Sequence, residues 1–431
     1  MDEEQPRESD TPAAPATADR PASTVEPDGD PSWRVTLYAA WVAQIISIIG
    51  FSFVMPFFPF YIRELGITDP RLVPIWSGLV MTAGGISMTV AGPLWGMVAD
   101  RYGRKLMVQR AMFGGAVIMG LMGLVSNVYH LLVLRLLQGA VTGTVPASIA
   151  LVSSVTPRNR MGYSMGLMQM AVFAGSSLGP WVGGSVADRF GYRVPFAVTA
   201  GLLACAGVLV LFGTRERFQR PAAHEVQAAH SIRSLLRLPG VTTLLVVYCA
   251  LNLSATIVTP IFPLFVERLL HTDAGAASAT GMILAITGIA AAGAAVVIGR
   301  AGDRRGHHRI LVAATAAAGL MCFPQAVAHS VGQLLAVRVV FGLAAGGMIP
   351  TMNSLVAGLV PRRSLGSIYG MTAAASASGA ALGPLLGGWL AASMGLRAPF
   401  VLMGAMLVML ALMVQWRVAT PTANDDPDPG P

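Results

Sequence analysis

The sequence predicts an all-α integral membrane protein with twelve transmembrane helices in two six-helix halves. Three observations lead to this fold class: a composition too poor in charge for a soluble surface, twelve apolar runs of spanning length, and a duplication relating the two halves. Hydrophobic residues make up 54% of the 431 residues and charged residues 12%, about half the usual charged share. A lipid-facing surface places no demand for charges, whereas a soluble surface does.

Charged residues are concentrated outside this apolar part of the chain. Of the 21 Asp and Glu residues, nine precede Trp33 and three follow Asn424. Both ends are acidic and proline-rich, so we expect them to be disordered. The predicted organisation is an acidic cytoplasmic tail (1–33), an N-terminal half (34–214), a cytoplasmic linker (215–240), a C-terminal half (241–417) and a second cytoplasmic tail (418–431).

Twelve runs are long enough to cross a membrane. A helix that crosses the hydrocarbon needs about 20 predominantly apolar residues. Short loops join the runs, except for residues 214–240. The predicted spans are 36–61, 76–98, 106–126, 129–152, 163–186, 195–213, 241–265, 278–298, 310–328, 331–355, 367–391 and 398–416.

The basic residues indicate how these spans are oriented. Short cytoplasmic loops of membrane proteins are enriched in Arg and Lys. With the N-terminus in the cytoplasm, the inner loops carry 17 basic residues and the outer loops six. An even number of spans returns the chain to the same side, so we expect both termini in the cytoplasm.

The chain contains an internal duplication. The segment VMPFFPFYIREL (Val54–Leu65) recurs as VTPIFPLFVERL (Val258–Leu269), with the charged pair changed from Arg63-Glu64 to Glu267-Arg268. Other segments recur at the same offset of 203 or 204 residues. Because six spans separate the copies, both halves have the same orientation and are related by an axis along the membrane normal. Prolines break both copies, which we interpret as the flexible outer ends of two matching gate helices.

Three motifs of the first half carry a family resemblance. GMVADRYGRK (Gly96–Lys105) resembles the inner-loop signature, LLVLRLLQG (Leu131–Gly139) the fourth-helix signature and GSSLGPWVGG (Gly175–Gly184) the fifth-helix antiporter signature of the major facilitator superfamily. Over residues 33–416 the chain is similar to the twelve-helix bacterial drug:proton antiporters, and within them to the MdtG-like multidrug exporters. The resemblance implies the major facilitator fold and a place in a bacterial cytoplasmic (inner) membrane.

The inner-loop motif and its second copy are predicted to gate the cytoplasmic side. Gly96 and Gly103 are expected to bracket a tight turn, where glycine's conformational freedom is useful. The resemblance places Asp100 against the N-terminus of the eleventh span near Ser367, where the helix dipole favours an anion. Alternatively, the charges only fix the topology. The candidate gate residues are Gly96, Asp100, Arg101, Gly103, Arg104 and Lys105, with Asp303, Arg304 and Gly306 in the second copy.

The partner of the inner-loop arginine in several relatives is absent from its usual place. In those relatives an acid lies at the cytoplasmic end of the fourth span. The corresponding stretch here, Ser148–Pro157, contains no acid. We therefore do not expect the full charge relay of the family.

The fifth-span motif places glycines at every fourth position. Such a face lets helices approach backbone to backbone, and Pro180 removes one helical hydrogen bond and bends the span. We expect this face to seal the interface between the halves. Its residues are Gly175, Gly179, Pro180, Gly183 and Gly184, with Gly379, Gly383, Pro384 and Gly387 as counterparts in the eleventh span.

Away from the ends of the predicted spans, the charged residues are Arg135 and its duplicate Arg338. A charge within the bilayer costs about 3 kcal/mol or more, so it usually faces a cavity or a partner. Arg135 shares a helix face with Gln138 and Thr142, and the resemblance implies a coupling or substrate role. The alternative is a structural arginine bonded to carbonyls of the first span. Arg338 is the second candidate, with Phe341 in place of the glutamine.

Polar residues at helical spacing in apolar spans predict a central cavity. The seventh span carries such a stripe, and the first span has polar residues at two matching positions. In the fifth span a glutamine lies among methionines, which suit a promiscuous apolar site, although interhelical packing explains each methionine equally well. The cavity candidates are Gln44, Ser52, Gln169, Tyr248, Asn252 and Thr256.

No Asp or Glu lies inside a predicted span. Many drug:proton antiporters of this type carry the proton on such a carboxylate, so the sequence does not identify the proton-carrying group. A cationic substrate would find no compensating charge in the membrane. We hypothesise that neutral, zwitterionic or anionic compounds fit better beside Arg135.

Other functional classes lack their sequence features. There is no HExxH motif, no P-loop and no intramembrane acid or His pair, so we expect no enzyme. Cys205, Cys249 and Cys322 lie singly in apolar runs, which excludes a disulfide framework or a CxxC metal site, and no metal or cofactor is expected. The net charge of +8 comes from loop arginines rather than a basic domain, so nucleic acid is not a predicted partner.

These features together predict a monomeric secondary active transporter. It would export small amphipathic drugs or metabolites by alternating access, in exchange for protons. A nutrient symporter of the same fold and a non-transporting membrane sensor are the alternatives. The fifth-span motif favours export, and the nearly intact motifs of the first half argue against a sensor. The expected partners are the lipid bilayer, a small-molecule substrate and protons.

Overall fold

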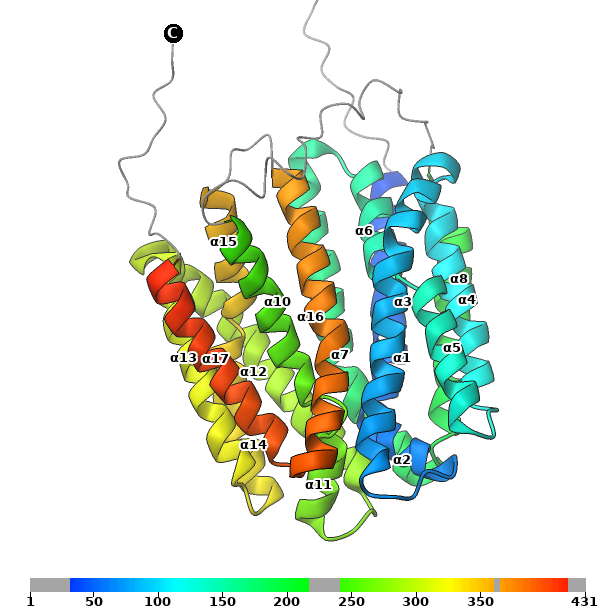
Figure 1. The fold of residues 1–431 in the computed structure, drawn as a ribbon. Helices are drawn as coiled ribbons and strands as arrows, with labels where there is room; N and C mark the ends of the chain where they lie inside the picture. The colour runs from blue at the N-terminus through cyan, green and yellow to red at the C-terminus, as the bar shows by residue number, and fades with distance from the viewer. Residues whose placement is uncertain (1–31, 217–240, 360–364, 418–431) are drawn as a thin grey trace, which may run out of the picture.

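The computed structural model describes residues 32–216, 241–359 and 365–417, and this part of the chain forms a bundle of roughly parallel helices (Figure 1). Twelve spans cross the bundle, as the sequence predicts. Eight are single helices: α3 (Leu72–Tyr102), α4 (Arg104–Met122), α7 (Met161–Phe190), α8 (Val194–Gly213), α12 (Ala276–Arg305), α13 (His307–Ala326), α16 (Leu365–Met394) and α17 (Ala398–Arg417).

The other four spans are broken into two pieces. They are the first, α1 (Ser32–Phe53) with α2 (Phe58–Glu64); the fourth, α5 (Val128–Val141) with α6 (Thr144–Val155); the seventh, α10 (Val241–Ile257) with α11 (Phe262–Leu270); and the tenth, α14 (Val331–Ala345) with α15 (Met348–Leu359).

The breaks have local causes. Prolines start the second pieces of the first and seventh spans, because proline lacks the N–H that a helix interior requires. The fourth span breaks at Gly143, whose φ of 120° is a glycine conformation. The tenth breaks between two glycines, Gly346 and Gly347. Every third span is therefore discontinuous, at equivalent places in the duplicated halves.

Length and composition support a membrane location. Within the described residues, nine helices, counting a broken span as one, are long and apolar enough to cross a membrane. The helices α4, α7 and α16 complete the twelve and lie alongside the others in the same bundle (Figure 1). The chain is therefore a multi-pass membrane protein.

The bundle has two ends, which we name by the position of the chain termini. At the terminal face, the top of Figure 1, α1 begins and α17 ends. At the distal face, the bottom of Figure 1, α2 and α11 end. The C-terminal half packs a hydrophobic core of its own, whereas the core of the N-terminal half also includes Leu264, Ala276 and Ala277 of the other half. The halves meet where α7 lies against α12 and α3 against α16.

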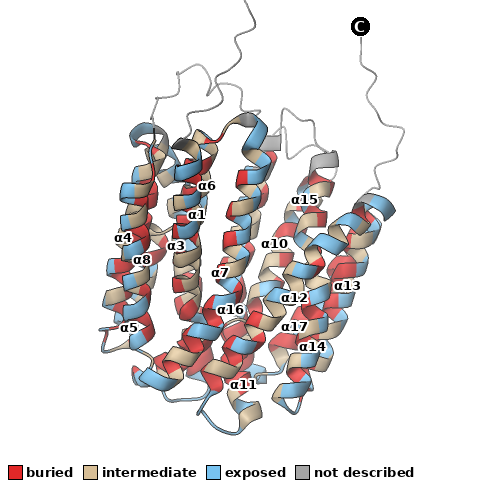
Figure 2. Cartoon of the chain, turned by 180° about the vertical axis from the view of Figure 1, so that it is seen from behind, coloured by how far each residue is buried: buried red, intermediate tan, exposed pale blue. Residues whose placement is uncertain are grey.

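The two halves touch near the distal face and part toward the terminal face (Figure 2). A methyl group added to any of four glycines would overlap backbone atoms of the other half: Gly78, Gly184, Gly281 and Gly388. Nearer the terminal face of the same helices, it would meet no described neighbour within 4 Å at Gly92, Gly96, Gly166, Gly293 or Gly299. Among the described residues, the bundle is thus closed at the distal face and open at the terminal face.

Candidate functional site

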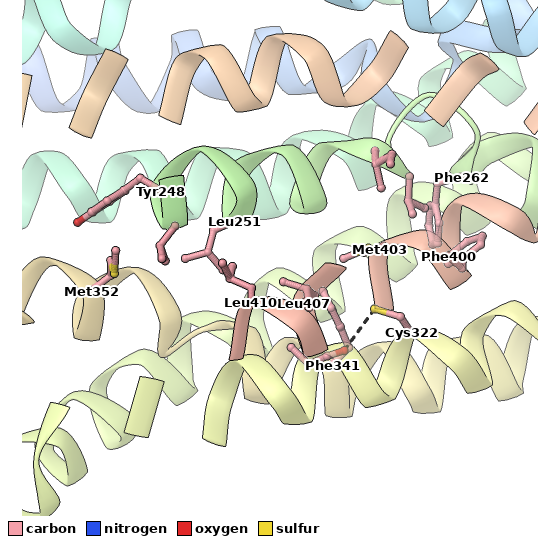
Figure 3. Packing of buried hydrophobic residues seen from close by; sticks show 14 of the residues in the cluster. Tyr248, Leu251, Phe262, Cys322, Phe341, Met352, Phe400, Met403, Leu407 and Leu410 are labelled. Carbon is pink, nitrogen blue, oxygen red and sulfur yellow. Dashed lines mark hydrogen bonds between the residues drawn. The ribbon is translucent and has the colours of Figure 1, made fainter. Parts of the chain in front are cut away.

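A cavity of about 290 Å³ lies where the two broken spans of the C-terminal half meet. Most of its wall is apolar, and Leu251, Phe262, Phe341, Met403 and Leu407 belong to the buried cluster drawn in Figure 3. The remaining lining residues are Met55, Asn252, Ala255, Val258, Thr259, Pro263, Leu284, Arg338, Ala345, Met348 and Ile349. Among these lining residues Met55 alone comes from the N-terminal half, so the cavity lies mainly within one half and reaches its boundary with the other.

Arg338 is the charged residue of this cavity wall. Only 8% of the residue is exposed. Its guanidinium carbon lies 4.3 Å from the ring centre of Phe262 and 5.3 Å from that of Phe341. No described residue accepts a hydrogen bond from it, and its buried Nε has no described partner. The two rings attract the cation but supply no counter-charge.

Arg135 occupies the duplicated position in α5 but has different neighbours. Its Nη1 donates a hydrogen bond to Oε1 of Gln138 one turn along the helix. Its guanidinium carbon lies 4.9 Å from the ring centre of Phe58 in α2, and Arg135 does not line the cavity. The interaction with the first span is therefore made with an aromatic ring rather than with backbone carbonyls.

The predicted polar stripe of α10 divides among three environments. Asn252 lines the cavity and donates through Nδ2 to the carbonyl of Tyr248 at 2.9 Å. The Tyr248 hydroxyl is buried and donates to Oδ1 of Asn353 at 2.5 Å. Thr256 donates to the carbonyl of Asn252, and its hydroxyl lies where a methyl group on Gly383 would point. Tyr248 and Thr256 are not among the residues that line this cavity, so for these two the cavity role stays a prediction.

The cavity candidates of the N-terminal half do not line the same cavity. Gln44 is fully buried, and neither of its amide atoms has a described partner. Ser52 packs against Gly179 of α7, whose added methyl group would lie 2.5 Å from the serine Cβ. Gln169 is exposed and lines a separate apolar opening of about 570 Å³ between α7 and α12. The sequence pattern identified these polar residues correctly, but it did not show which helix or opening each of them faces.

Sequence reasoning missed the aromatic and methionine part of the cavity wall. Phe262, Met348 and Ile349 lie directly beside the breaks of the seventh and tenth spans. The proline-broken segment signals the first break. The adjacent Gly346-Gly347 pair signals the second, because two glycines in one helix interior weaken it.

The inner-loop motif forms a single-residue turn at the terminal face. Helix α3 ends at Tyr102 and α4 begins at Arg104, so Gly103 alone reverses the chain, with φ 98° and ψ 154°. This region is accessible essentially only to glycine. Gly306 makes the matching turn with φ 90°. Gly96 does not bracket the turn: it lies inside α3, and a methyl group there would meet no described neighbour within 4 Å.

An acid holds the start of α4, although it is not the acid of the relatives. The Glu216 carboxylate accepts from the backbone N–H groups of Arg104 at 2.9 Å and Lys105 at 2.8 Å. The Lys105 ammonium in turn donates to the carbonyls of Leu211 and Thr214 at the end of α8, at 2.8 and 2.6 Å. Glu216 thus satisfies free N–H groups at the start of α4, and Lys105 satisfies free carbonyl groups at the end of α8. Sequence reasoning missed Glu216, since it lies in the predicted linker and not in a motif.

The second copy keeps half of this arrangement. His308, the counterpart of Lys105, is buried, and its Nε2 lies 3.1 Å from the carbonyl of Val414 near the end of α17. Arg101 and Arg304 are exposed, with Arg101 over the ring of Tyr102. The side chains of Asp100, Asp303 and Ser367 lie outside those that the structure describes, so the proposed Asp100 latch stays a prediction.

The swapped charge order of the repeat has a structural reason at the distal face. Arg63 of α2 and Glu267 of α11 occupy equivalent positions and face each other, with Nη1 and Oε1 2.5 Å apart. Two equal charges at these positions would repel each other. The swap turns that repulsion into a salt bridge between the halves. Glu64 instead accepts from Nε of Arg193 at 2.8 Å within its own half, and this hydrogen bond raises the arginine pKa.

A second polar contact joins the halves at the distal face. Asp188, at the end of α7, accepts from the backbone N–H of Ser278 at 2.7 Å and from its hydroxyl at 2.5 Å. Ser278 lies in the first turn of α12, where free N–H groups and the helix dipole favour an anion. The equivalent position in α16 is Ala392, so this contact exists in one copy. We name the Arg63–Glu267 and Asp188–Ser278 contacts the distal latch.

The antiporter motif packs mostly inside its own half. Methyl groups on Gly175, Gly179 and Gly183 would strike Ile48, Ser52 and Phe53 of α1 respectively. The prediction that these glycines seal the two halves is wrong. Only Gly184 faces the other half, against Ala277 of α12, while the Pro180 carbonyl lies against Gly281. In the second copy, Gly379, Gly383 and Gly387 face α10 in the same way.

The described residues contain no group of three or more His, Cys, Asp or Glu side chains that could hold a metal ion. Cys205 is exposed, Cys249 is partly buried and Cys322 is buried, and all three are free thiols. In the part of the chain that the structure describes, the site thus combines a cavity that contains a buried cation with a closed distal end and an open terminal end.

Comparison with known proteins assigns this architecture to a family. The family model described as Major Facilitator Superfamily matches residues 40–273 and again 244–430, which follows the duplication. Multidrug resistance protein MdtG of Citrobacter koseri is 34% identical over 382 residues, covering 88% of this chain and 94% of that protein. Multidrug resistance protein MdtG of Escherichia coli is 33% identical over 395 residues, covering 91% and 97%.

Solved structures share the fold at low sequence identity. A mutant of the nucleoside transporter NupG matches with a TM-score of 0.71 and 15% identity, over 88% of this chain and all of that one. A bacterial homologue of the human lysosomal transporter Spinster, solved inward-facing and unoccupied, gives a TM-score of 0.71 and 15% identity, over 90% and 97%. The human organic anion transporter MFSD10 gives 0.64 and 17%, over 90% and 100%.

Proposed function

The chain belongs to the major facilitator superfamily, and from this we propose that it exports small amphipathic compounds in exchange for protons. It is a membrane transporter rather than an enzyme. The relatives named multidrug resistance proteins align over nearly the whole chain, which supports drugs or drug-like metabolites as the exported class. Two six-helix halves related as parallel repeats are the architecture of alternating access.

The observation that carries this proposal is the asymmetry between the two ends of the bundle. Glycine-to-backbone contacts and the distal latch close one end, whereas the glycines toward the other end have no described neighbour beside them. In an alternating-access transporter this is one of two states, and the second state exchanges the open and closed ends. Glycines that are free in this state would then carry the closed contacts in the other.

We assign the terminal face to the cytoplasm and the distal face to the outside. The excess of basic residues in the loops at the terminal face supports this orientation. The protein is then inward-open, with both termini inside a bacterial cytoplasmic membrane, and acts as a monomer. The inner-loop residues would close the cytoplasmic end in the outward-open state.

Proton coupling is part of the proposal and does not rest on an intramembrane carboxylate. Acids of the described spans lie at their ends, as Glu64, Glu267 and Asp188 do at the distal face. A proton exchanged there would act on contacts that close the outer mouth.

The test is drug accumulation in efflux-deficient bacterial cells expressing the protein. We expect lower accumulation of at least one compound from a panel of anionic, neutral and cationic drugs, with normal accumulation restored by a protonophore. Accumulation that rises on expression would make the protein an importer. Export that a protonophore does not change would remove the proton from the proposal.

A further inference from the structure

Arg338 is a buried cation whose charge the described residues around it do not compensate. The residues that line its cavity include no acid, and the other polar lining side chains are Asn252 and Thr259. An uncompensated charge in the hydrocarbon region is costly. Aromatic rings beside the guanidinium lower that cost without removing its capacity to bind an anion.

The Arg338 guanidinium is available to bind an anion in the cavity. The buried Nε of Arg338 is unpaired among the described residues, and no hydrogen bond from its other nitrogens to a described residue exists. A guanidinium offers a planar fork of donors that matches a carboxylate in two parallel hydrogen bonds. The rest of the wall is mainly Leu, Met, Ile, Val and Phe, which suits an apolar body attached to that carboxylate.

We propose that the Arg338 cavity binds the acid group of the transported compound, so that the exported class consists of small amphipathic organic acids with an aromatic or branched body. The inference rests on the proposed export function and specifies its substrate. The guanidinium binds the carboxylate between Phe262 and Phe341, and the body lies against Met348, Ile349 and Leu407 toward Met55.

A comparison with Arg135, the equivalent residue of the N-terminal half, explains why Arg338 is the cation that binds substrate. In α5 the residue three positions after the arginine is Gln138, which accepts a hydrogen bond from Arg135. In α14 the corresponding residue is Phe341, which has no acceptor. The loss of one amide leaves Arg338 available to an external anion.

A matched set of three ligands tests this: naphthoate, naphthamide and naphthylmethylammonium, which share one apolar body and differ in charge. Binding is measured by equilibrium dialysis on the full-length purified protein in uncharged detergent. We expect naphthoate to bind about tenfold more tightly than naphthamide, the scale of one charge-assisted hydrogen bond, and the ammonium to bind most weakly.

Arg338→Gln should remove the preference for naphthoate while the affinity for naphthamide stays within about twofold. Phe341→Gln retains the arginine and restores the acceptor of the other half, so it should reduce the preference in a protein that keeps its cation. Arg309→Gln, an exposed arginine of α13 outside the cavity, is the control and should change nothing.

The inference is overturned if wild type binds naphthoate no better than naphthamide, or if Arg338→Gln and Phe341→Gln both keep the full preference. Transport in proteoliposomes separates this from the export proposal. Proton-driven export of naphthamide with no acid preference would sink the inference alone. No transport of any of the three ligands, with the binding preference intact, would count against export and leave the acid site standing.

Discussion

The two intramembrane arginines compare one position in two copies of the same scaffold. Both lie in the first piece of a broken span, and both guanidinium groups lie over a phenylalanine ring. Arg135 is hydrogen-bonded to a neighbour on its own helix, whereas Arg338 has no hydrogen-bond partner among the described residues and lines a cavity. The residue three positions after each arginine differs, and of the two only Gln138 offers an acceptor, whereas Phe341 offers a ring. Duplication thus supplies two equivalent cation positions, and local chemistry decides which one is available to a ligand.

The packing of the glycine motifs, in contrast, is the same in both halves. Glycines of α7 face α1, and their counterparts in α16 face α10, with backbone so close that no side chain fits. Polar contacts at the distal face are not repeated: Asp188 caps α12, but Ala392 at the equivalent position has no side chain that could cap α3. The shared scaffold is therefore built from glycine, and the two halves differ in charged and polar residues.

The largest loss of stability is expected from substitutions in the glycine motifs, which pack alike in both halves. A methyl group on Gly183 would strike the backbone of Phe53, and one on Gly387 the backbone of Ile257. We expect Gly183→Ala and Gly387→Ala each to lower the free energy of unfolding by about 3 kcal/mol, at the upper end of overpacking costs. Thermal unfolding in detergent measures this.

Gly201→Ala is the control for this pair, because a methyl group there meets no described neighbour within 4 Å. It should be neutral or slightly stabilising, since alanine favours a helix interior over glycine. If only one of the two paired variants is destabilised, the halves do not share their packing.

The next largest effect is expected when Gln138 and Phe341, which occupy equivalent positions in the two halves, are each replaced by the residue of the other half. Gln138→Phe leaves Arg135 without its acceptor and should cost about 1–3 kcal/mol of stability, the penalty of an unpaired buried polar group. Phe341→Gln gives Arg338 an acceptor, which offsets part of the packing lost with the buried ring, so it should lower stability less than Gln138→Phe does. Chemical unfolding of both variants in detergent tests the comparison directly, and equal losses in both would contradict it.

The sequence was sufficient for the fold and insufficient for the site. Apolar runs of spanning length, loop arginines and the 203–204 offset predict twelve helices in two parallel halves, because the bilayer requires each of these features. Helical spacing did not separate Asn252, which lines the cavity, from Tyr248 and Thr256, which contact neighbouring helices, because spacing defines a face but not its neighbour. Met348 and Ile349 escaped prediction because apolar residues in an apolar span carry no distinguishing signal.

The same limit applies to contacts between distant segments. Glu216 lies more than one hundred positions from the helix start it holds, and no local pattern marks it. The Arg63–Glu267 pair was visible as a swapped repeat, but its partners became evident only when the pseudo-symmetry axis brought equivalent positions together.

A moderate effect is expected at Glu216, which distinguishes the terminal faces of the two halves. Glu216→Ala removes the acceptor of two backbone N–H groups at the start of α4. Stability should fall by about 1 kcal/mol, the usual value of a helix N-cap, and Glu216→Gln should fall between wild type and alanine. Thermal unfolding measures both, and an unchanged alanine variant would mean that water replaces the carboxylate without loss.

The smallest effect is expected at the Arg63–Glu267 pair, because 36% of the arginine side chain and 18% of the glutamate side chain are exposed. Such partly exposed pairs contribute about 0.2–1 kcal/mol. Glu267→Gln should therefore open the distal end only about 1.4- to fivefold more often. Thiol labelling from the distal side of a single cysteine placed at Thr259, in a cysteine-free background, reports this opening.

The exchanged pair Arg63→Glu with Glu267→Arg sharpens the argument, since it reverses both charges and keeps their attraction. We expect labelling to return to the wild-type rate in this double variant, whereas Arg63→Glu alone places two acids at equivalent positions and should label fastest. If the double variant labels as fast as the single one, the charges act on other partners. The swapped order in the repeat would then have no role in closing the distal end.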